Sequence, residues 1–510
     1  MKRVGLFTGV ACAALFASAE MEPATPESQG VSSEGILEFI DAAEKTFDAG
    51  PAGALHGFVI VRHGKTIAEG SWKPFDTLNE THMLYSHSKS FTSSAIGFLA
   101  DEGKIDLDER IIDIFPEETP AEPSENLRSL RVRDLLTMNV GKRDHLLRDG
   151  GDWAREFLSM DFTRKPGTGF KYDSDATYML AAIVEKKSGM KMMDYLKVKM
   201  FDKIGIEKAW TTFSPQGIPC GGWGMNMTTR ELARFGQLYL QKGWWNGENL
   251  ISPLWVTLAT TRHTWSGWQY VGAQKLGAGN DWEQGYGFQF WRCTHGAYRA
   301  DGAAGQLTVV MPEQDMVVSV HAGLDDMQKE LDLIWTHLLP AVKDAPLPEN
   351  AAAQAKLKDR LAKLEIKLPG LHVETGPRKY DDHGLDRHYF EFKDNHRGFK
   401  SFSYQKGDND VYACILETRC GRQEIVAGTP RSHLGLWQTS CIAVDPENYE
   451  GLGAYIGRHK LASTCWYDAD GAFHFKAYFT GDTGFLELTD RNGRLTGEFK
   501  AMNGCKLESK

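Results

Sequence analysis

The sequence predicts an α+β protein in which an antiparallel sheet flanked by helices is followed by a second, antiparallel β domain, a sandwich or a barrel. Within the first hundred residues, a helical pattern, a hairpin and a long helix follow one another. Strand patterns return near residue 286, after a helical middle, and would complete the sheet that the hairpin begins. From Arg378 onward, short alternating runs separated by Gly, Asn and Asp are typical of an antiparallel β domain.

The first elements are placed by their capping and turn residues. Polar residues followed by apolar positions at helical spacing predict a helix over Ser32–Phe47. Residues His56–Trp72 are typical of two strands joined by a His-Gly-Lys turn. The stretch "LYSHSKSFTSSAIGFL" at residues 84–99 then begins a helix that ends near Gly103. The apolar second half of this helix indicates that it is buried.

The later elements divide the chain. Helices are expected at Val132–Met138, Asp175–Lys187, Thr229–Lys242 and Gln328–Leu339, and strands at Tyr286–Cys293, Gly305–Glu313 and Met316–Gly323. Prolines, an Ala/Lys/Glu-rich stretch and a Pro-Gly stop predict a linker with one surface helix over residues 343–370. We expect a signal peptide (1–19), a main domain (20–342), this linker and a C-terminal β domain (371–510).

The N-terminus has the pattern of a secretory signal peptide. A Lys-Arg pair at residues 2 and 3 precedes an apolar run to residue 16, and Ala-Ser-Ala ends at residue 19. About 13 apolar residues are too few to span a bilayer, and no other stretch reaches the roughly 18 that a spanning helix needs. Cys12 leaves lipidation as an alternative, although the Ala-Ser-Ala site lies beyond it. We expect an exported protein, periplasmic or extracellular after cleavage near Ala19.

Charge and cysteine content exclude several function classes. The formal net charge of −10 disfavours nucleic acid and anionic membrane as partners. No Cys-x-x-Cys and no His/Cys cluster with zinc spacing occurs, so we expect no metal and no organic cofactor. Five of the seven cysteines beyond the signal follow residue 400, where one or two disulfides are expected. Cys220 and Cys293 are expected to be buried and unpaired.

Ser-x-x-Lys pairs are the first candidates for nucleophilic chemistry, because residues three apart on a helix share one face. The pattern occurs at Ser86/Lys89, Ser188/Lys191 and Ser403/Lys406. Ser188 precedes a glycine at a helix end, and Ser403 lies in an alternating strand, where residues three apart face opposite sides. Only Ser86 begins a helix expected to be buried. Partial desolvation there would lower the pKa of Lys89, and helix N-terminal amides would favour an oxyanion.

Two further segments carry candidate residues. In "GFKYDSDATYMLAAIV", Tyr172 is the only one of the 16 tyrosines followed two residues later by Ser or Asn, here Ser174. Together they could relay a proton and donate a hydrogen bond. In "YRADGAAGQLTVV", small residues at Ala300–Gly302 lead into a strand, and the amide of Ala303 could point at a carbonyl oxygen. Taken singly, these segments are more simply a helix entry with a core tyrosine and a common strand start.

Ser-x-x-Lys, Tyr-x-Ser and small-x-Gly in this order resemble the motif set of the serine β-lactamase and penicillin-binding-protein-like superfamily, in particular its class C-like esterase and amidase branch. The resemblance covers about residues 24–340 and includes "LRVRDLLTMNVG" and "GGWGMNMTTRELARFGQLYLQKG". It implies a β-lactamase-like fold with an all-helical subdomain beside the antiparallel sheet.

The resemblance also implies roles for the matching residues. Ser86 would be the acylated nucleophile, Lys89 the base that activates it, and Tyr172 the relay that protonates the leaving group. The amides of Ser86 and Ala303 would form the oxyanion hole. Ser174 would stand where many relatives carry Asn, and it would bind substrate together with the segment Ala300–Gly302.

The third motif departs from the best-known members. Where β-lactamases and DD-peptidases have Lys-Thr-Gly or His-Thr-Gly, this chain has Ala300-Asp301-Gly302, which is similar to the 6-aminohexanoate-dimer hydrolase group. The lysine or histidine side chain that helps to hold a substrate carboxylate is therefore missing. Asp301 is expected to repel an anion. Arg299 could compensate, although an arginine at a strand edge is commonly solvated. β-Lactamase activity is therefore not the first expectation.

These features predict an exported serine hydrolase that cleaves a small ester, amide or peptide through a Ser86 acyl-enzyme. The alternatives are a D-amino-acid peptidase or DD-carboxypeptidase, β-lactamase-type activity, an acyltransferase, and a non-catalytic penicillin-binding-like sensor. Seven of the 14 tryptophans, from Trp244 to Trp291, could line an apolar pocket or simply pack against helices. Asp144 and His145 could approach the site. The C-terminal β domain could bind a polymer, cap the cleft or only stabilise the rest.

Overall fold

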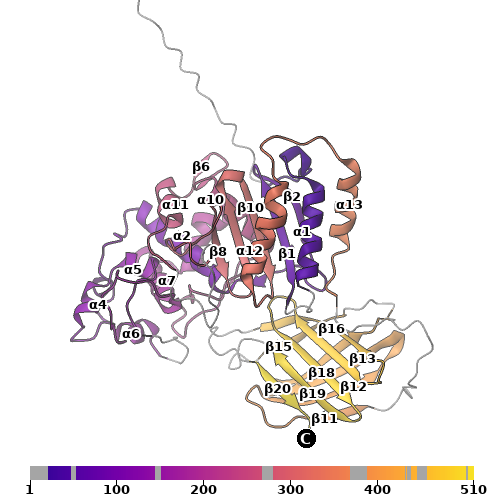
Figure 1. The fold of residues 1–510 in the computed structure, drawn as a ribbon. Coiled ribbons are helices and arrows are strands. Elements are labelled where there is room, and N and C mark those ends of the chain that lie inside the picture. The colour runs from indigo at the N-terminus through magenta and orange to yellow at the C-terminus, as the bar shows by residue number, and fades with distance from the viewer. Residues whose placement is uncertain are drawn as a thin grey trace, which may run out of the picture.

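The computed structural model describes residues 21–47, 53–143, 151–266, 280–367, 387–430, 432, 438–444, 457–500 and 504–510. Figure 1 shows an α/β body and, beside it, a β body that ends the chain. The predicted signal peptide lies outside the described residues. Within the described residues, no helix is both long and apolar enough to cross a membrane.

Within the described residues, the α/β body contains a six-stranded antiparallel sheet. Its strands, in spatial order, are β2 (Lys65–Ser71), β1 (Leu55–Arg62), β10 (Met316–Ala322), β9 (Gln306–Met311), β8 (Tyr298–Gly302) and β7 (Trp291–Arg292). β1 pairs with β10 in antiparallel register, with Ile60 opposite Val318. The early hairpin and the late strands therefore form one sheet, which confirms the prediction.

Different helices cover the two faces of this sheet (Figure 1). The covering helices are α1 (Ser33–Thr46), α10 (Thr229–Leu240) and α12 (Met327–Leu333). Val59 and Val61 share a buried cluster with α10, whereas Phe58 and Ile60 share another with α1 and α12. This separation follows from the alternation of side chains across a strand.

The all-helical subdomain shares the buried cluster of α10. Its helices are α2 (Ser88–Asp101), α3 (Ile111–Ile114), α4 (Glu125–Ser129), α5 (Val132–Leu136), α6 (Trp153–Leu158), α7 (Ser174–Ser188), α8 (Met192–Leu196), α9 (Asp202–Ile204) and α11 (Pro253–Thr260). The predicted helices of this region are present as α5 and α7, with ends shifted by a few residues.

Short elements connect the longer ones. The two-residue strands are β3 (His82–Met83), β4 (Asn226–Met227), β5 (Trp244–Trp245) and β6 (Glu248–Asn249), paired as β3 with β4 and β5 with β6. The short helical turns are η1 (Glu27–Gln29), η3 (Tyr85–His87), η4 (Lys197–Phe201), η5 (Pro312–Gln314), η6 (Ile334–Leu338), η7 (Leu339–Ala341) and η8 (Asp408–Asp410).

The strand predicted over Tyr286–Cys293 is wrong except near its end, where β7 lies. Gln289 has a φ of 65°, so the backbone turns there. The carbonyls of Phe288 and Gln289 accept hydrogen bonds of 2.7 Å from Ser93 and Ser90 of α2. This segment therefore bonds a buried helix instead of a neighbouring strand. Alternation of polar and apolar residues in the sequence does not reveal such contacts.

The segment predicted as a linker packs on the α/β body. α13 (Ala351–Ala362) contacts α1 and β2, and Leu357, Leu364 and Ile366 belong to the buried cluster beneath α1. The backbone of Lys73 donates to the carbonyl of Leu364 and accepts from the amide of Ile366. The domain boundaries at residues 342 and 370 stay predictions. Residues 351–366 pack against the α/β body.

The C-terminal body is a sheet that curls round on itself and is antiparallel except at one strand pair. As far as the structure describes the chain, its ten strands are β11 (His388–Glu391), β12 (Phe399–Lys406), β13 (Val411–Thr418), β14 (Gly421–Gly428), β15 (Gln438–Val444), β16 (Gly457–Tyr467), β17 (Phe473–Phe479), β18 (Phe485–Arg491), β19 (Arg494–Lys500) and β20 (Cys505–Glu508). The ends of the first and last strands meet, because Phe392 bridges to Ser509 and the Lys393 amide donates to the Glu508 carbonyl. The predicted β domain is confirmed in a barrel-like form.

The cysteines differ in part from expectation. Cys220 and Cys293 are buried free thiols, as the sequence predicts. In the C-terminal body, Cys414, Cys465 and Cys505 are also free thiols. With three of the five late cysteines free, two disulfides cannot form there.

Candidate active site

Ser86 is the accessible residue in an otherwise buried stretch. β3 and Leu84 lead into η3, and α2 follows directly. Between His82 and Leu99, every side chain except that of Ser86 is buried. Tyr85 adopts a left-handed backbone with a φ of 48°, which is unfavourable for a bulky residue. The turn therefore presents the Ser86 hydroxyl at the beginning of a buried helix.

The neighbouring serines of α2 have structural partners. The hydroxyls of Ser88, Ser90 and Ser93 donate to the carbonyls of Tyr85, Gln289 and Phe288, each at 2.7 Å. Ser94 bonds the Ser90 carbonyl at 2.9 Å. A buried polar group is costly without a hydrogen bond, so these contacts allow a serine-rich helix to be buried.

Lys89 lies one helical turn from Ser86, with its side chain inside the protein. Its Nζ donates to Ser86 Oγ at 3.0 Å, to Ser174 Oγ at 3.0 Å and to the Gly222 carbonyl at 2.6 Å. The sequence did not single out Gly222, which lies in the "GGWGMN" stretch. One amine thus joins the beginnings of α2 and α7 to the loop before β4.

Burial also changes the charge state of Lys89. It lowers the pKa of this amine to about 7, although the carboxylates of Asp173, Asp175 and Asp301 oppose the shift. An amine with this pKa is neutral in about half of the molecules near pH 7. It can therefore accept the proton of the Ser86 hydroxyl.

Tyr172 and Ser174 come to the same place from the entry of α7. Lys89 Nζ lies 4.8 Å from the centre of the Tyr172 ring, within the range of a cation–π contact. The ring stacks on Trp291, with centres 5.7 Å apart. Residues separated by more than 80 positions in the chain are thus adjacent in space.

A charged network holds the entry of α7. Lys142 Nζ pairs with Asp173 at 3.1 Å and with Asp175 at 3.0 Å, and all three side chains are almost completely buried. Asp173 also caps α7 by accepting from backbone amides. Burial raises the pKa of Asp173 to about 6. The sequence did not indicate Lys142, and the nearby candidates Asp144 and His145 lie outside the described residues.

The end of β8 passes directly beside the Ser86 turn. A Cβ on Gly302 would lie 2.0 Å from the Leu84 carbonyl oxygen, so only glycine allows this approach. Ala303 follows and is exposed. The Gln306 side-chain amide donates to the carbonyls of Ala303 and Ala304, each at 3.2 Å, and holds this loop.

Arg299 and Asp301 form a buried ion pair, so the expectation of a solvated arginine is wrong. Arg299 Nε lies 2.6 Å from Asp301 Oδ2, and the two side chains are 0% and 6% exposed. The guanidinium also lies over the Trp282 ring, 4.4 Å from its centre. Residues two apart on a strand face the same side, while Ala300 faces the other and is buried in the core. The carboxylate of Asp301 is therefore paired rather than directed at solvent.

Two of the clustered tryptophans lie beside the site. Trp282 and Trp291 pack in a small cluster with Phe170 and Tyr286, and Tyr172 covers it. The others differ: Trp245 and Trp255 belong to the main core, Trp244 and Trp265 are exposed, and Trp268 lies outside the described residues. Of the two alternatives offered for these tryptophans, packing fits most of those described, and only Trp282 and Trp291 lie in the cluster beside Tyr172.

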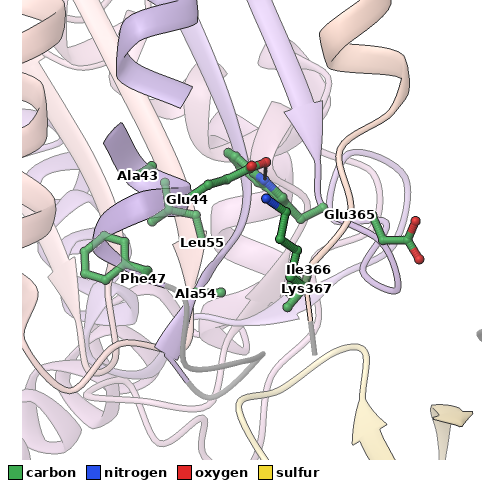
Figure 2. Close-up of a pocket in the computed structure, with 9 residues that line it drawn as sticks. Ala43, Glu44, Phe47, Ala54, Leu55, Glu365, Ile366 and Lys367 are labelled. Atoms are coloured by element: carbon green, nitrogen blue, oxygen red, sulfur yellow. Dashed lines mark hydrogen bonds between the residues drawn. The ribbon is translucent and has the colours of Figure 1, made fainter. Parts of the chain in front are cut away.

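A small cavity lies away from this site. Figure 2 shows it between the end of α1, the beginning of β1 and residues Glu365–Lys367. Its volume is about 30 Å³, and it lies on the α1 side of the sheet, whereas Ser86 lies with α2 in the cluster of α10. It belongs to the packing of the segment after α13. Elsewhere in the described residues, no group of three His, Cys, Asp or Glu side chains could hold a metal ion.

A comparison with known families matches the part of the chain that contains Ser86, Lys89 and Tyr172. The family model described as Beta-lactamase matches residues 40–342, more than half of the chain. This chain belongs to the β-lactamase family. The matched region contains all the candidate catalytic residues and ends before the C-terminal β body.

Three proteins to which this chain is similar are distant from it in sequence. The chain is 26% identical to the 6-aminohexanoate-dimer hydrolase of Paenarthrobacter ureafaciens over 254 residues, which are 46% of this chain and 64% of that relative, less than two thirds of its length. A Bacillus anthracis structure provisionally named 6-aminohexanoate-dimer hydrolase has a TM-score of 0.50 at 21% identity, covering 65% of this chain and 89% of its own. A Bacteroides dorei structure provisionally named β-lactamase has a TM-score of 0.50 at 14% identity. The match covers 61% of this chain and 99% of that structure's chain. Family membership supports hydrolase activity.

Proposed function

We propose that this chain is a serine hydrolase that cleaves an ester or amide bond through an acyl-enzyme on Ser86. The observation that carries the proposal is the 3.0 Å hydrogen bond between Lys89 Nζ and Ser86 Oγ, the accessible hydroxyl of a buried stretch. Because burial brings the pKa of Lys89 to about 7, the amine is suited to proton transfer near neutral pH.

In the proposed acylation step, Ser86 Oγ attacks the substrate carbonyl carbon while Lys89 Nζ takes the hydroxyl proton. The amides of Ser86 and Ala303 donate to the oxyanion of the tetrahedral intermediate. The carbon–oxygen or carbon–nitrogen bond then breaks, and the leaving alcohol or amine receives the proton through Tyr172 and Lys89. In deacylation, water attacks the Ser86 ester and passes its proton back along the same route.

The β8 edge lacks the residue that would help to hold the carboxylate of a β-lactam. Ala300 and Asp301 occupy the positions of the carboxylate-binding residues in the best-known members, and Asp301 is paired with the buried Arg299. The relative from P. ureafaciens is named as a hydrolase of 6-aminohexanoate dimer. We therefore propose small esters and amides as substrates, with Ser174 and Gly302 beside the bound acyl group.

A test combines a fluorophosphonate probe with a p-nitrophenyl ester and the corresponding p-nitroanilide. The probe should label Ser86, and Ser86→Ala should lose labelling and hydrolysis of both substrates. Ser188→Ala is the matched control, because Ser188 also precedes a lysine by three residues but lies at the end of α7. This variant should retain the activity of the parent protein.

Full hydrolysis by Ser86→Ala would overturn the proposal. Labelling without turnover of any ester, amide or peptide would instead support a penicillin-binding-like sensor. Release of D-Ala from a muropeptide without cleavage of simple esters would support a D-amino-acid peptidase.

A further inference from the structure

The C-terminal β body reaches the chain that leads into Ser86. The turn between β17 and β18, residues 480–484, lies against residues 81–85 of the α/β body. The Met83 amide donates to the Gly481 carbonyl at 2.9 Å, and a Cβ on Gly481 would lie 3.1 Å from the Thr81 carbonyl oxygen. The β17–β18 turn thus continues the hydrogen bonding of β3 on the side away from β4.

A buried hydrogen bond joins this turn to the residue before the nucleophile. The Tyr85 hydroxyl donates to Asp482 Oδ1 at 2.5 Å and lies 2.9 Å from Thr483 Oγ1. Tyr85 is 6% exposed and Asp482 is 3% exposed. Hydrogen bonds to a carboxylate are stronger than neutral ones, and burial shields this one from water.

Tyr85 needs such support because of its backbone. A left-handed conformation at a bulky residue persists only where the surroundings hold it. From the α/β body, the Leu84 amide donates to the Met225 carbonyl at 2.8 Å, and Ser88 Oγ donates to the Tyr85 carbonyl at 2.7 Å. These contacts hold the backbone, whereas the hydroxyl of Tyr85 is held by the other body.

The same strands also line a cleft beside Leu324, which bonds the loop that carries Ala303. Tyr478 and Phe485, on either side of the β17–β18 turn, line a cleft of about 330 Å³ together with Leu324. The Leu324 amide donates to the Ala304 carbonyl at 2.9 Å. The C-terminal body therefore contacts the segment before Ser86 and faces, across this cleft, the residue that bonds the loop of Ala303.

We propose that the β17–β18 turn is a positioning element of the active site, in which Asp482 acts through the Tyr85 hydroxyl to aim Ser86. This inference rests on the proposed function of Ser86. Asp482 does not touch substrate in this role. It keeps the turn at Tyr85 in the conformation that directs Ser86 Oγ and the Ser86 amide at the substrate carbonyl.

The test compares Asp482→Asn, Tyr85→Phe and the double variant in the full chain. Both single variants should slow acylation, measured as the rate of probe labelling and the burst of p-nitrophenol, by about 10- to 100-fold, because a small misplacement of a reacting group has effects of this size. The dissociation constant of the substrate, taken from the dependence of the pre-steady-state acylation rate on substrate concentration, should change little, since the ground-state contacts stay. The double variant should be no slower than the slower single variant, because both changes remove one interaction.

A matched control separates positioning from stability. Tyr404 donates to Asp490 at 2.7 Å in a similar buried tyrosine–aspartate pair that lies wholly within the C-terminal body. Asp490→Asn and Tyr404→Phe should lower the unfolding temperature but keep the parent acylation rate in the folded protein.

Parent acylation rates in Asp482→Asn and Tyr85→Phe would overturn the inference. Multiplicative losses in the double variant, or equal losses in Asp490→Asn, would also overturn it. Ser86→Ala, measured in parallel, separates failure of the proposed function from failure of this inference. If Ser86→Ala still turns over substrate, the proposed function fails. If Ser86→Ala is inactive while Asp482→Asn is fully active, only the inference fails.

Discussion

At the scale of single residues, environment distinguishes Lys89 from the other lysines of the Ser-x-x-Lys pairs. Lys191 is 53% exposed and pairs with Glu185, while Ser188 bonds the amide of Met190. Ser403 accepts hydrogen bonds from Arg387 instead of a lysine. The other two pairs therefore lack this environment, and the burial of Lys89 beside an accessible serine is the reason to propose the first pair as the reactive one.

The pH dependence of acylation is expected to follow Lys89. Because this amine accepts a proton only when it is neutral and its pKa is about 7, kcat/KM should rise with pH through about 7 and then level off. Lys89→Met should lower kcat/KM by about 10²- to 10⁴-fold and remove this rise. Steady-state rates from about pH 5.5 to 9 check both effects.

Lys191→Met serves as the control and should keep the parent profile. A parent rate that does not change across this pH range, or an unchanged inflection in Lys89→Met, would contradict the assignment of Lys89 as the base.

At the scale of elements, the site depends on how closely β8 approaches the Ser86 turn. Alternation along β8 directs Arg299 and Asp301 to one side and Ala300 to the other, and the absence of a side chain at Gly302 lets the strand end touch Leu84. The serine hydroxyls of α2 then bond the backbone of Phe288 and Gln289. α2 is therefore bonded to the segment that leads into β7, the strand that pairs with β8.

Gly302→Ala is expected to move the loop of Ala303 away from Ser86. The added Cβ would lie 2.0 Å from the Leu84 carbonyl oxygen, so one backbone segment must shift, and a shift of about 1 Å can cost about 10²-fold in rate. Acylation by the fluorophosphonate probe measures the loss. Gly407→Ala is the control, because its Cβ would have ordinary contacts, the nearest at 3.4 Å. Equal rates in the parent and Gly302→Ala would refute this reading of β8.

At the scale of the whole molecule, the segment between the two bodies belongs to the packing of the first. Leu364 is 1% exposed, and the backbone around it pairs with Lys73 after β2. A flexible linker would show neither property. The α/β body is therefore expected to depend on residues beyond 342 for its stability.

Leu364→Ala should destabilise the α/β body by about 2–5 kcal/mol, the cost of truncating a buried leucine. Urea unfolding followed by near-ultraviolet circular dichroism measures the change. Lys358→Ala, at an exposed position of α13, should stay within about 0.5 kcal/mol of the parent protein. A loss below about 1 kcal/mol in Leu364→Ala would indicate a loosely attached segment.

Local patterns made much of this architecture predictable. The early hairpin, α1, α2, α7, α10 and the alternating strands of the last domain carry their periodicity and caps within short windows, so their existence could be inferred from the sequence. Ser86, Lys89 and Tyr172 could be selected because their spacing resembles a known motif set. The strand prediction over Tyr286–Cys293 was wrong because the backbone turns at Gln289 and bonds α2 instead of a neighbouring strand.

The sequence by itself determined the α+β organisation, the candidate nucleophile and its base, since these depend on contacts between residues that are near in the chain. Only the tertiary structure decided that Arg299 neutralises Asp301, that Lys142 holds the entry of α7, and that Asp482 bonds Tyr85 from the far end of the chain. Each of these depends on side chains that folding brings together and then shields from water. The spacing of Arg299 and Asp301 puts them on one face of a strand but does not show that the pair is buried, and no spacing links Lys142 to α7 or Asp482 to Tyr85.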